Sequence, residues 1–109
     1  MPDRLPPLTS LQYLVLGVLR GSDQPGRAVR DAMTRHGVRS SAPAFYQMMA
    51  RLERARLVEG WYEQITVGDQ AVTERRYRIT AAGERLWSET QAFYQSVASA
   101  AARKRWSNA

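Results

Sequence analysis

Hydrophobic residues in the first half of the chain recur every three or four positions, which is the spacing of amphipathic helices. A first helix is expected to begin near Thr9, because Thr9 and Gln12 have the spacing of a capping box. Its apolar stripe consists of Leu11, Leu14, Val15, Val18 and Leu19. A second helix is expected between the candidate N-caps Ser22 and Asp23 and the stop at Gly37.

A third helix is expected after Ser40-Ser41, where either serine can be the N-cap and Pro43 suits the first turn. The helical spacing places Phe45, Met48, Met49, Leu52 and Ala55 on one apolar face. The opposite face carries Gln47, Ala50, Arg51 and Arg54. This helix therefore buries apolar groups inward and presents glutamine and arginine outward.

After the third helix, the pattern changes to residues that favour extended backbone. A strand is expected over 58–67, then a turn at Gly68-Asp69-Gln70 and a second strand over roughly 72–80. The order is helix, helix, helix, hairpin and a last helix. It indicates a mainly α fold with a small β-hairpin, namely a winged helix-turn-helix followed by a long C-terminal helix.

The last helix is capped by Thr80 and is expected from Ala81 to about Arg105. At about 1.5 Å per residue it is roughly 35–40 Å long, more than three short helices and a hairpin can cover. A second copy of the chain is the simplest cover for its outer half, so a homodimer is expected. The expected interface consists of Leu86, Trp87, Thr90, Phe93, Tyr94, Val97 and Ala101.

Arginine dominates the charge of the chain. The 109 residues include 16 basic and 10 acidic side chains, a formal net charge of +6, and every basic residue except Lys104 is arginine. The planar guanidinium donates paired hydrogen bonds to phosphates and base edges, so nucleic acid is the first partner to consider. Composition alone is equally consistent with an arginine excess that serves only solubility.

Enzymatic and membrane functions are not expected. The chain has no cysteine, its single histidine is His36 on the apolar side of the second helix, and its carboxylates show no paired arrangement. No glycine-rich phosphate loop and no set of metal ligands is visible, so no catalytic residue, metal or cofactor is expected. Without a signal peptide or a membrane-spanning apolar stretch, the protein is expected in the cytoplasm.

The second helix of a helix-turn-helix pair enters the major groove of double-stranded DNA, and here that is the third helix. Glutamine can pair with adenine and arginine with guanine, while a tyrosine hydroxyl or a wing arginine can reach phosphate. The expected DNA contacts are Ser40, Ser41, Ala44, Tyr46, Gln47, Arg51 and Arg54 of the helix, and Arg75 and Arg76 of the wing. The chain then divides into a flexible lead over 1–8, a DNA-binding winged helix-turn-helix over 9–80, and a dimerisation helix and tail over 81–109.

Two other interpretations of these arginines stay open. Arg51 and Arg54 can form a solvated face paired with Glu53 or Glu59. The chain can also be a winged-helix protein-interaction module without specific DNA binding. Charge placement separates these functions, because DNA binding favours one continuous basic face. The arginines concerned are Arg27, Arg30, Arg39, Arg51, Arg54, Arg75 and Arg76.

Three segments resemble the PadR family of transcriptional regulators. The stretch 45–53, FYQMMARLE, followed by LVE at 57–59, is similar to the family's recognition helix and its exit. The stretch 76–83, RYRITAAG, is similar to the passage from wing to C-terminal helix, and 14–19, LVLGVL, to the first helix. The order and spacing of the three segments together carry the resemblance, from about residue 11 to 95.

The resemblance implies a homodimeric winged-helix repressor that dimerises through a single C-terminal helix. Some members of the family bind planar aromatic effectors near that interface. Here Trp87, Phe93, Tyr94 and Trp106 would supply the aromatic side chains of such a site. Packing in the core of a dimer explains these aromatic residues equally well.

The chain departs from the family pattern inside the expected DNA-binding unit. Pro43-Ala44 stand in place of Gly-Thr, Gln47 in place of Pro, and Arg56 in place of Gly. The turn 21–26, GSDQPG, lacks the family's tyrosine. The resemblance therefore implies DNA binding by fold but says nothing of the base preference.

Overall fold

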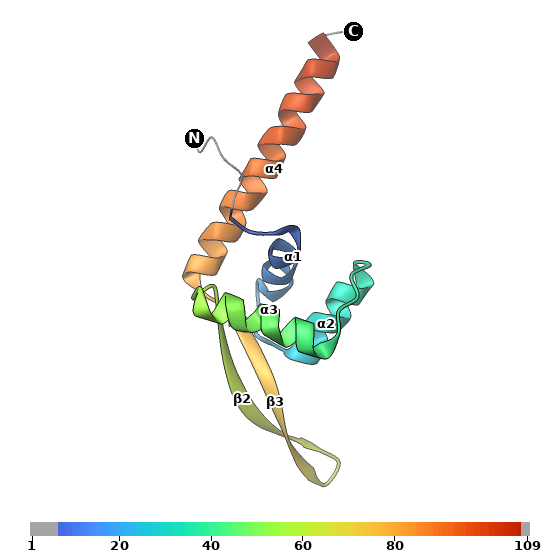
Figure 1. Ribbon diagram of the computed structural model, residues 1–109, viewed down its shortest axis with the longest axis vertical. Coiled ribbons are helices and arrows are strands. Elements are labelled where there is room, and N and C mark those ends of the chain that lie inside the picture. The colour runs from blue at the N-terminus through green and yellow to red at the C-terminus, as the bar shows by residue number, and fades with distance from the viewer. Residues whose placement is uncertain (1–6, 108–109) are drawn as a thin grey trace.

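The computed structural model describes the backbone of residues 7–107 and the side chains of residues 7–104. Its elements are α1 (Ser10–Leu19), β1 (Gln24–Pro25), α2 (Gly26–Arg35), α3 (Ala42–Arg54), β2 (Val58–Val67), β3 (Gln70–Ile79) and α4 (Ala81–Ser107). The three short helices form one group, the β2–β3 hairpin extends from one side of it, and α4 extends from the other (Figure 1). This arrangement confirms the expected winged helix-turn-helix with a long C-terminal helix.

The starts of α1, α3 and α4 follow the expected capping residues. The Thr9 hydroxyl accepts a hydrogen bond from the Gln12 amide at 3.1 Å, and the Gln12 side chain completes the capping box. The Ser41 hydroxyl accepts from the Ala44 amide at 3.2 Å. The Thr80 hydroxyl accepts a hydrogen bond from the Gly83 amide at 3.0 Å and so caps the first turn of α4. These oxygens satisfy amide groups that have no partner inside the helix.

The start of α2 differs from the expectation. Neither Ser22 nor Asp23 caps this helix, because Pro25 is the N-cap residue and Gln24–Pro25 form β1, which pairs antiparallel with β3. The Gln24 side chain donates a hydrogen bond to the Val18 carbonyl at 2.6 Å and so ties β1 to α1. Proline has no amide hydrogen and therefore fits an edge strand. The expected hairpin is thus part of a three-stranded sheet with the order β1-β3-β2.

The core lies between the three short helices and the base of the sheet. Its buried side chains include Val15, Leu16 and Leu19 of α1, Val29 and Met33 of α2, Phe45, Met49 and Leu52 of α3, and Val58 and Tyr77 of the hairpin. The apolar face expected for α3 is confirmed except at Ala55, which is exposed as the C-cap residue. Burying this face sets the direction in which the rest of α3 points.

Two residues lie elsewhere than the sequence analysis places them. His36 is exposed at the C-cap of α2 instead of on its apolar side, because the helix ends at Arg35 and the chain turns at Gly37, whose φ is +81°. Leu8, part of the expected flexible lead, is buried in the core. Residues 1–6 of that lead lie outside the described residues.

The turn between α3 and β2 explains the departure from the family pattern at Arg56. Arg56 has a φ of +61°, in the left-handed region that glycine adopts most readily. Its backbone is held in place, because the Arg56 amide donates to the Glu53 carbonyl at 2.9 Å and the Thr80 hydroxyl donates to the Arg56 carbonyl at 2.7 Å. The turn therefore favours glycine at this position, and in this chain the two hydrogen bonds hold Arg56 in the same conformation.

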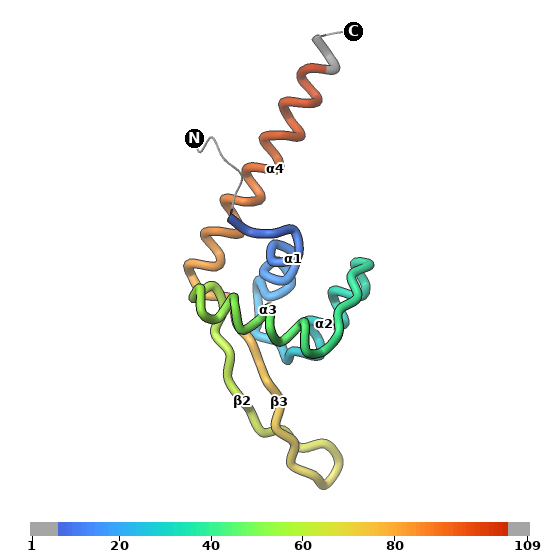
Figure 2. The backbone as a smooth tube through the Cα atoms, in the orientation of Figure 1, coloured from blue at the N-terminus to red at the C-terminus, as the bar shows by residue number. Residues whose placement is uncertain are grey.

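Only the first part of α4 is covered by the rest of the chain. Thr90 is completely buried, whereas Tyr94 and Val97, one and two turns further along, are 44% and 52% exposed. Figure 2 shows the C-terminal half of α4 extending beyond α1. Thr90 was expected at the dimer interface. Because its own chain buries it completely, it has no surface left to contact a partner, and this part of the prediction is wrong.

Replacing Gly83 with alanine is expected to destabilise the protein by about 1–2 kcal/mol, because overpacking against backbone outweighs the better helix propensity of alanine. A Cβ at this position would lie against the Leu57 carbonyl oxygen and 2.8 Å from Ile79 Cγ1. Chemical unfolding at one fixed protein concentration measures the change. Ser88→Ala, at an exposed position of the same helix, is the control and should be neutral or slightly stabilising. A Gly83→Ala variant as stable as the native chain would contradict the close approach of α4 to Leu57.

Candidate nucleic-acid interface

The exposed surface of α3 divides into an outward face and two flanks. At 100° per residue, Gln47 and Arg54 lie opposite the buried side chains, and both are exposed. Ala44 and Arg51 lie on the flank toward α1, and Tyr46 lies on the flank toward the hairpin. The residues expected to contact DNA therefore share one helix but do not all point in the same direction.

The flank toward α1 borders a shallow groove of about 280 Å³. Its lining brings together four of the residues expected to contact DNA, namely Ser40, Ala44, Gln47 and Arg51. The Ser41 hydroxyl is engaged by the Ala44 amide, and the Ser40 hydroxyl donates to the Ser41 carbonyl at 3.2 Å. The two serines thus shape the start of α3, and the groove leaves Gln47 and Arg51 as its longer polar side chains from α3.

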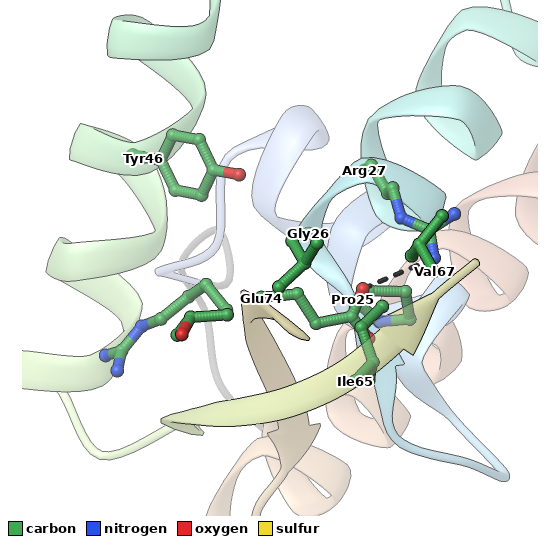
Figure 3. A pocket seen from close by; sticks show the side chains of 10 residues that line it. Pro25, Gly26, Arg27, Tyr46, Ile65, Val67 and Glu74 are labelled. Atoms are coloured by element: carbon green, nitrogen blue, oxygen red, sulfur yellow. Dashed lines mark hydrogen bonds and ion pairs between the residues drawn. The ribbon is translucent and has the colours of Figure 1, made fainter. Parts of the chain in front are cut away.

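The flank toward the hairpin borders a cleft of about 500 Å³ between α3, the start of α2 and the wing (Figure 3). Tyr46 packs edge-on against Phe45, with ring centroids 5.0 Å apart, and its ring remains partly exposed to the cleft. A Cβ on Gly26 would lie 3.0 Å from the Tyr46 hydroxyl, so glycine provides room for that group. Tyr46 is therefore half packing residue and half surface residue, and its hydroxyl lies at the rim of the cleft.

The wing arginines are held by carboxylates. Arg76 is hydrogen-bonded to Asp23 at 2.6 Å and to Glu74 at 2.9 Å, lies 3.4 Å from Glu63, and its side chain is 19% exposed. The hydrogen bond that Arg76 donates to Asp23 is the main cause that raises the pKa of Arg76 above its ordinary value. Arg75, the next residue along the strand, points to the other sheet face and pairs with a different acid. Both arginines are therefore engaged by acids of their own chain, and their contact with phosphate stays a prediction.

Positive charge is concentrated on the helix-turn-helix instead of on the wing. The segment 26–54 contains six arginines and two acids, a net charge of +4, whereas the hairpin 58–79 contains three arginines and four acids, a net charge of −1. Arg39, Arg51 and Arg54 are exposed, and among the described residues none of them forms an ion pair. These three unpaired arginines lie on α3 and the turn before it, whereas Arg75 and Arg76 of the wing are paired with acids.

Arg27 and Arg30, which were also expected on a basic face, have partners on neighbouring elements. Arg27 forms an ion pair with Glu74 at 3.3 Å, drawn as a dashed line in Figure 3, and Arg30 donates to the Ser40 carbonyl at 3.0 Å. Arg27 remains largely exposed in spite of this pair. Glu74, which pairs with Arg27 and Arg76, was not expected as an arginine partner, and Glu53 was considered as a partner of Arg51 or Arg54 but pairs with Arg75. Residue types and spacing contain no signal for pairs formed between distant elements.

Aromatic residues at the start of α4 pack against α1. The Trp87 ring stacks on Tyr13 with centroids 5.2 Å apart, and the Arg20 guanidinium lies 3.9 Å from its centroid. The Trp87 Nε1 atom is buried and has no hydrogen-bond partner among the described residues. Leu86 also packs against the core of its own chain. Leu86 and Trp87, both expected at the dimer interface, therefore serve first as contacts between α4 and the winged helix.

The outer half of α4 presents a different set of side chains. Phe93 lies edge-on to Tyr94 at 5.3 Å, and Tyr94, Val97 and Ala101 are exposed on the continuation of the stripe that buries Thr90. The Trp106 side chain, considered for an effector site, lies outside the described residues. Within the described residues no group of three or more acidic or histidine side chains is placed to hold a metal ion. No helix in that part of the chain is long and apolar enough to cross a membrane.

No protein-family model matches the sequence, and comparison with curated proteins finds no match. Among solved structures, a PadR family transcriptional regulator from Eggerthella lenta is 28% identical, with a TM-score of 0.66 over 86% of this chain and 80% of that one. A PadR family regulator from Clostridium difficile has a TM-score of 0.74 at 13% identity, over 87% and 97% of the two chains. Bacillus subtilis PadR, solved in complex with operator DNA, has a TM-score of 0.60 at 15% identity, over 74% of this chain and 47% of that one. The chain therefore has the winged helix-turn-helix fold of the PadR-family transcriptional regulators, with a single long C-terminal helix.

Proposed function

We propose that this protein is a sequence-specific DNA-binding regulator that acts as a homodimer and represses transcription. The observation that carries the proposal is the net charge of +4 on the segment 26–54, together with exposed arginines on α3 that have no acidic partner among the described residues. Basic charge on one face of a recognition helix is the electrostatic footprint of a DNA-binding protein. The likeness to the Bacillus subtilis PadR structure with operator DNA supports the same conclusion.

In this proposal α3 lies in the major groove with its outward face toward the bases. Gln47 is placed to pair with an adenine edge, and Arg54 with guanine or a phosphate further along the helix. Arg51, on the flank toward α1, faces the backbone on that side of the groove. The wing approaches the flanking DNA through its apolar and hydroxyl groups, because its arginines are already paired with acids.

The dimer is proposed to form along the outer half of α4. The stripe that is buried by the chain itself up to Thr90 continues as Tyr94, Val97 and Ala101, which are exposed. Covering an apolar stripe of this kind with a symmetry-related copy is the simplest closed arrangement. Two α3 helices related by a twofold axis would then read half-sites about one turn of DNA apart, roughly 34–36 Å. A dimer bound to such an operator near a promoter blocks polymerase, which gives repression.

The experiment that tests this function is binding of the purified protein to the DNA upstream of its own gene, against random competitor and across a salt series. Tight binding that resists competitor and weakens steeply as salt rises would support a sequence-specific regulator with several phosphate contacts. Binding equal to that of random DNA would count against that upstream region as the operator. Absence of binding even at low salt would contradict the proposal and favour a winged-helix protein-interaction module.

A further inference from the structure

The recognition helix carries one acid, and a wing arginine neutralises it. We propose that Arg75 supports DNA binding without touching DNA, by cancelling the charge of Glu53 on α3. This inference rests on the proposed DNA-binding function and assigns Arg75 as a positioning residue that acts through Glu53. It replaces the expectation that Arg75 is itself a phosphate contact of the wing.

The Arg75–Glu53 pair occupies a site that the surrounding residues shape for it. Arg75 Nη2 lies 2.5 Å from Glu53 Oε1, and the two side chains are only 23% and 26% exposed. A Cβ on Gly60 would meet the Glu53 carboxylate and lie 2.7 Å from Arg75 Nη2, so the glycine of β2 provides the space for the pair. The Arg75 guanidinium also lies 4.6 Å from the Tyr62 ring centroid. Leaving this site would break each of these contacts.

Glu53 is the only acid in the 13 residues of α3. It lies between Leu52 of the core and Arg54 of the outward face, and its carboxylate is partly shielded from water. A carboxylate in such a place, without a counterion, repels phosphate more strongly than one in open solvent, because there is less water to screen it. Pairing with Arg75 removes this repulsion and leaves the neighbouring arginines of α3 as the net charge that DNA meets.

The Arg75–Glu53 ion pair also connects the wing to the recognition helix. Arg75 belongs to β3, and Glu53 belongs to the last turn of α3, so one ion pair both cancels a charge and holds the hairpin against the helix. Tyr77, beside them, is buried, and this burial raises the pKa of its hydroxyl above the ordinary value. The hydroxyl is therefore neutral under ordinary conditions and adds no second negative charge to the site.

The test is a charge-rescue series measured as affinity for a short duplex of the protein's own upstream DNA at low salt. Arg75→Gln is expected to weaken binding about three- to tenfold, the effect of one uncompensated charge near phosphate. The double variant Glu53→Gln/Arg75→Gln should return to within about twofold of the native affinity, because the pair is then neutral. Glu53→Gln alone should bind at least as tightly as the native chain. Arg75→Lys, which keeps the charge, should also remain near the native affinity.

A control pair of the same kind lies on the opposite face of the hairpin from Arg75. Arg78 and Glu59 form an ion pair that is more than half exposed, so Arg78→Gln should change the affinity less than twofold. The inference is overturned if the double variant binds as weakly as Arg75→Gln, since Arg75 then contacts DNA itself. It is equally overturned if Glu53→Gln weakens binding. This second measurement does not depend on Arg75→Gln and can be made even if that variant fails to fold. Failure of the native chain to bind any DNA would instead remove the proposed function on which the inference rests.

Discussion

Replacing Arg51 and Arg54 together with alanine is expected to lower the affinity for operator DNA about a hundredfold. Each arginine that contacts a base or phosphate contributes about 1–3 kcal/mol, and each lost phosphate contact lowers the slope of log affinity against log salt by about one. Both side chains are exposed on α3, and among the described residues neither has an acidic partner. Fluorescence anisotropy of a labelled operator duplex over a salt series measures both quantities.

The matched control removes two arginines from another part of the molecule. Arg85 and Arg103 are exposed on α4 and are not in an ion pair within the described residues, so Arg85→Ala/Arg103→Ala subtracts the same charge. This control is expected to lose less than about threefold in affinity, because its charges belong to α4 and not to the proposed recognition helix. Equal losses in the two double variants would mean that overall charge matters and that α3 is not the contact surface.

Replacing Val97 with glutamate is expected to raise the dissociation constant of the homodimer about a hundredfold. Val97 is 52% exposed in the single chain and lies on the stripe formed with Tyr94 and Ala101. A twofold axis through this stripe would bring two glutamates into one apolar interface, and like charges there oppose association by several kcal/mol. Sedimentation over a range of protein concentrations measures the change. Operator affinity should fall with it, because a monomer reaches only one half-site.

The control for this prediction is Ser99→Glu. Ser99 is exposed and follows Val97 by two residues, which at 100° per residue places it on the other side of α4. The same charge at Ser99 should leave the dimer intact. If Val97→Glu stays as dimeric as Ser99→Glu, the chain associates through a different surface or remains a monomer.

The secondary structure was largely predictable because its signals act over a few residues. Thr9, Ser41 and Thr80 cap the helices that follow them, and the apolar spacing of α3 is that of a helix with one buried face. The strand over 58–67 follows from residues that favour extended backbone. The outward position of Gln47 and Arg54 follows from the same spacing, once the buried face of α3 is known.

Whether each arginine is paired with an acid or exposed without one was decided by the tertiary structure. Arg75 and Glu53 are 22 residues apart, Arg76 and Asp23 are 53 apart, and no local pattern connects them. The sequence shows two arginines on a wing, but folding places carboxylates beside both. Arg51 and Arg54 of α3 remain exposed without an acidic partner among the described residues.

Which side chains of α4 are buried was likewise decided by the packing of α4 against α1. Thr90 and Val97 belong to one helical stripe in the sequence, yet α4 contacts α1 only along its first part, so one is enclosed and the other exposed. The sequence by itself determined where helices and strands begin and which faces are apolar, because these depend on neighbours along the chain. Ion pairing and burial depend on distances between elements, and only the packing of those elements decides which charges and which apolar side chains remain available to a partner.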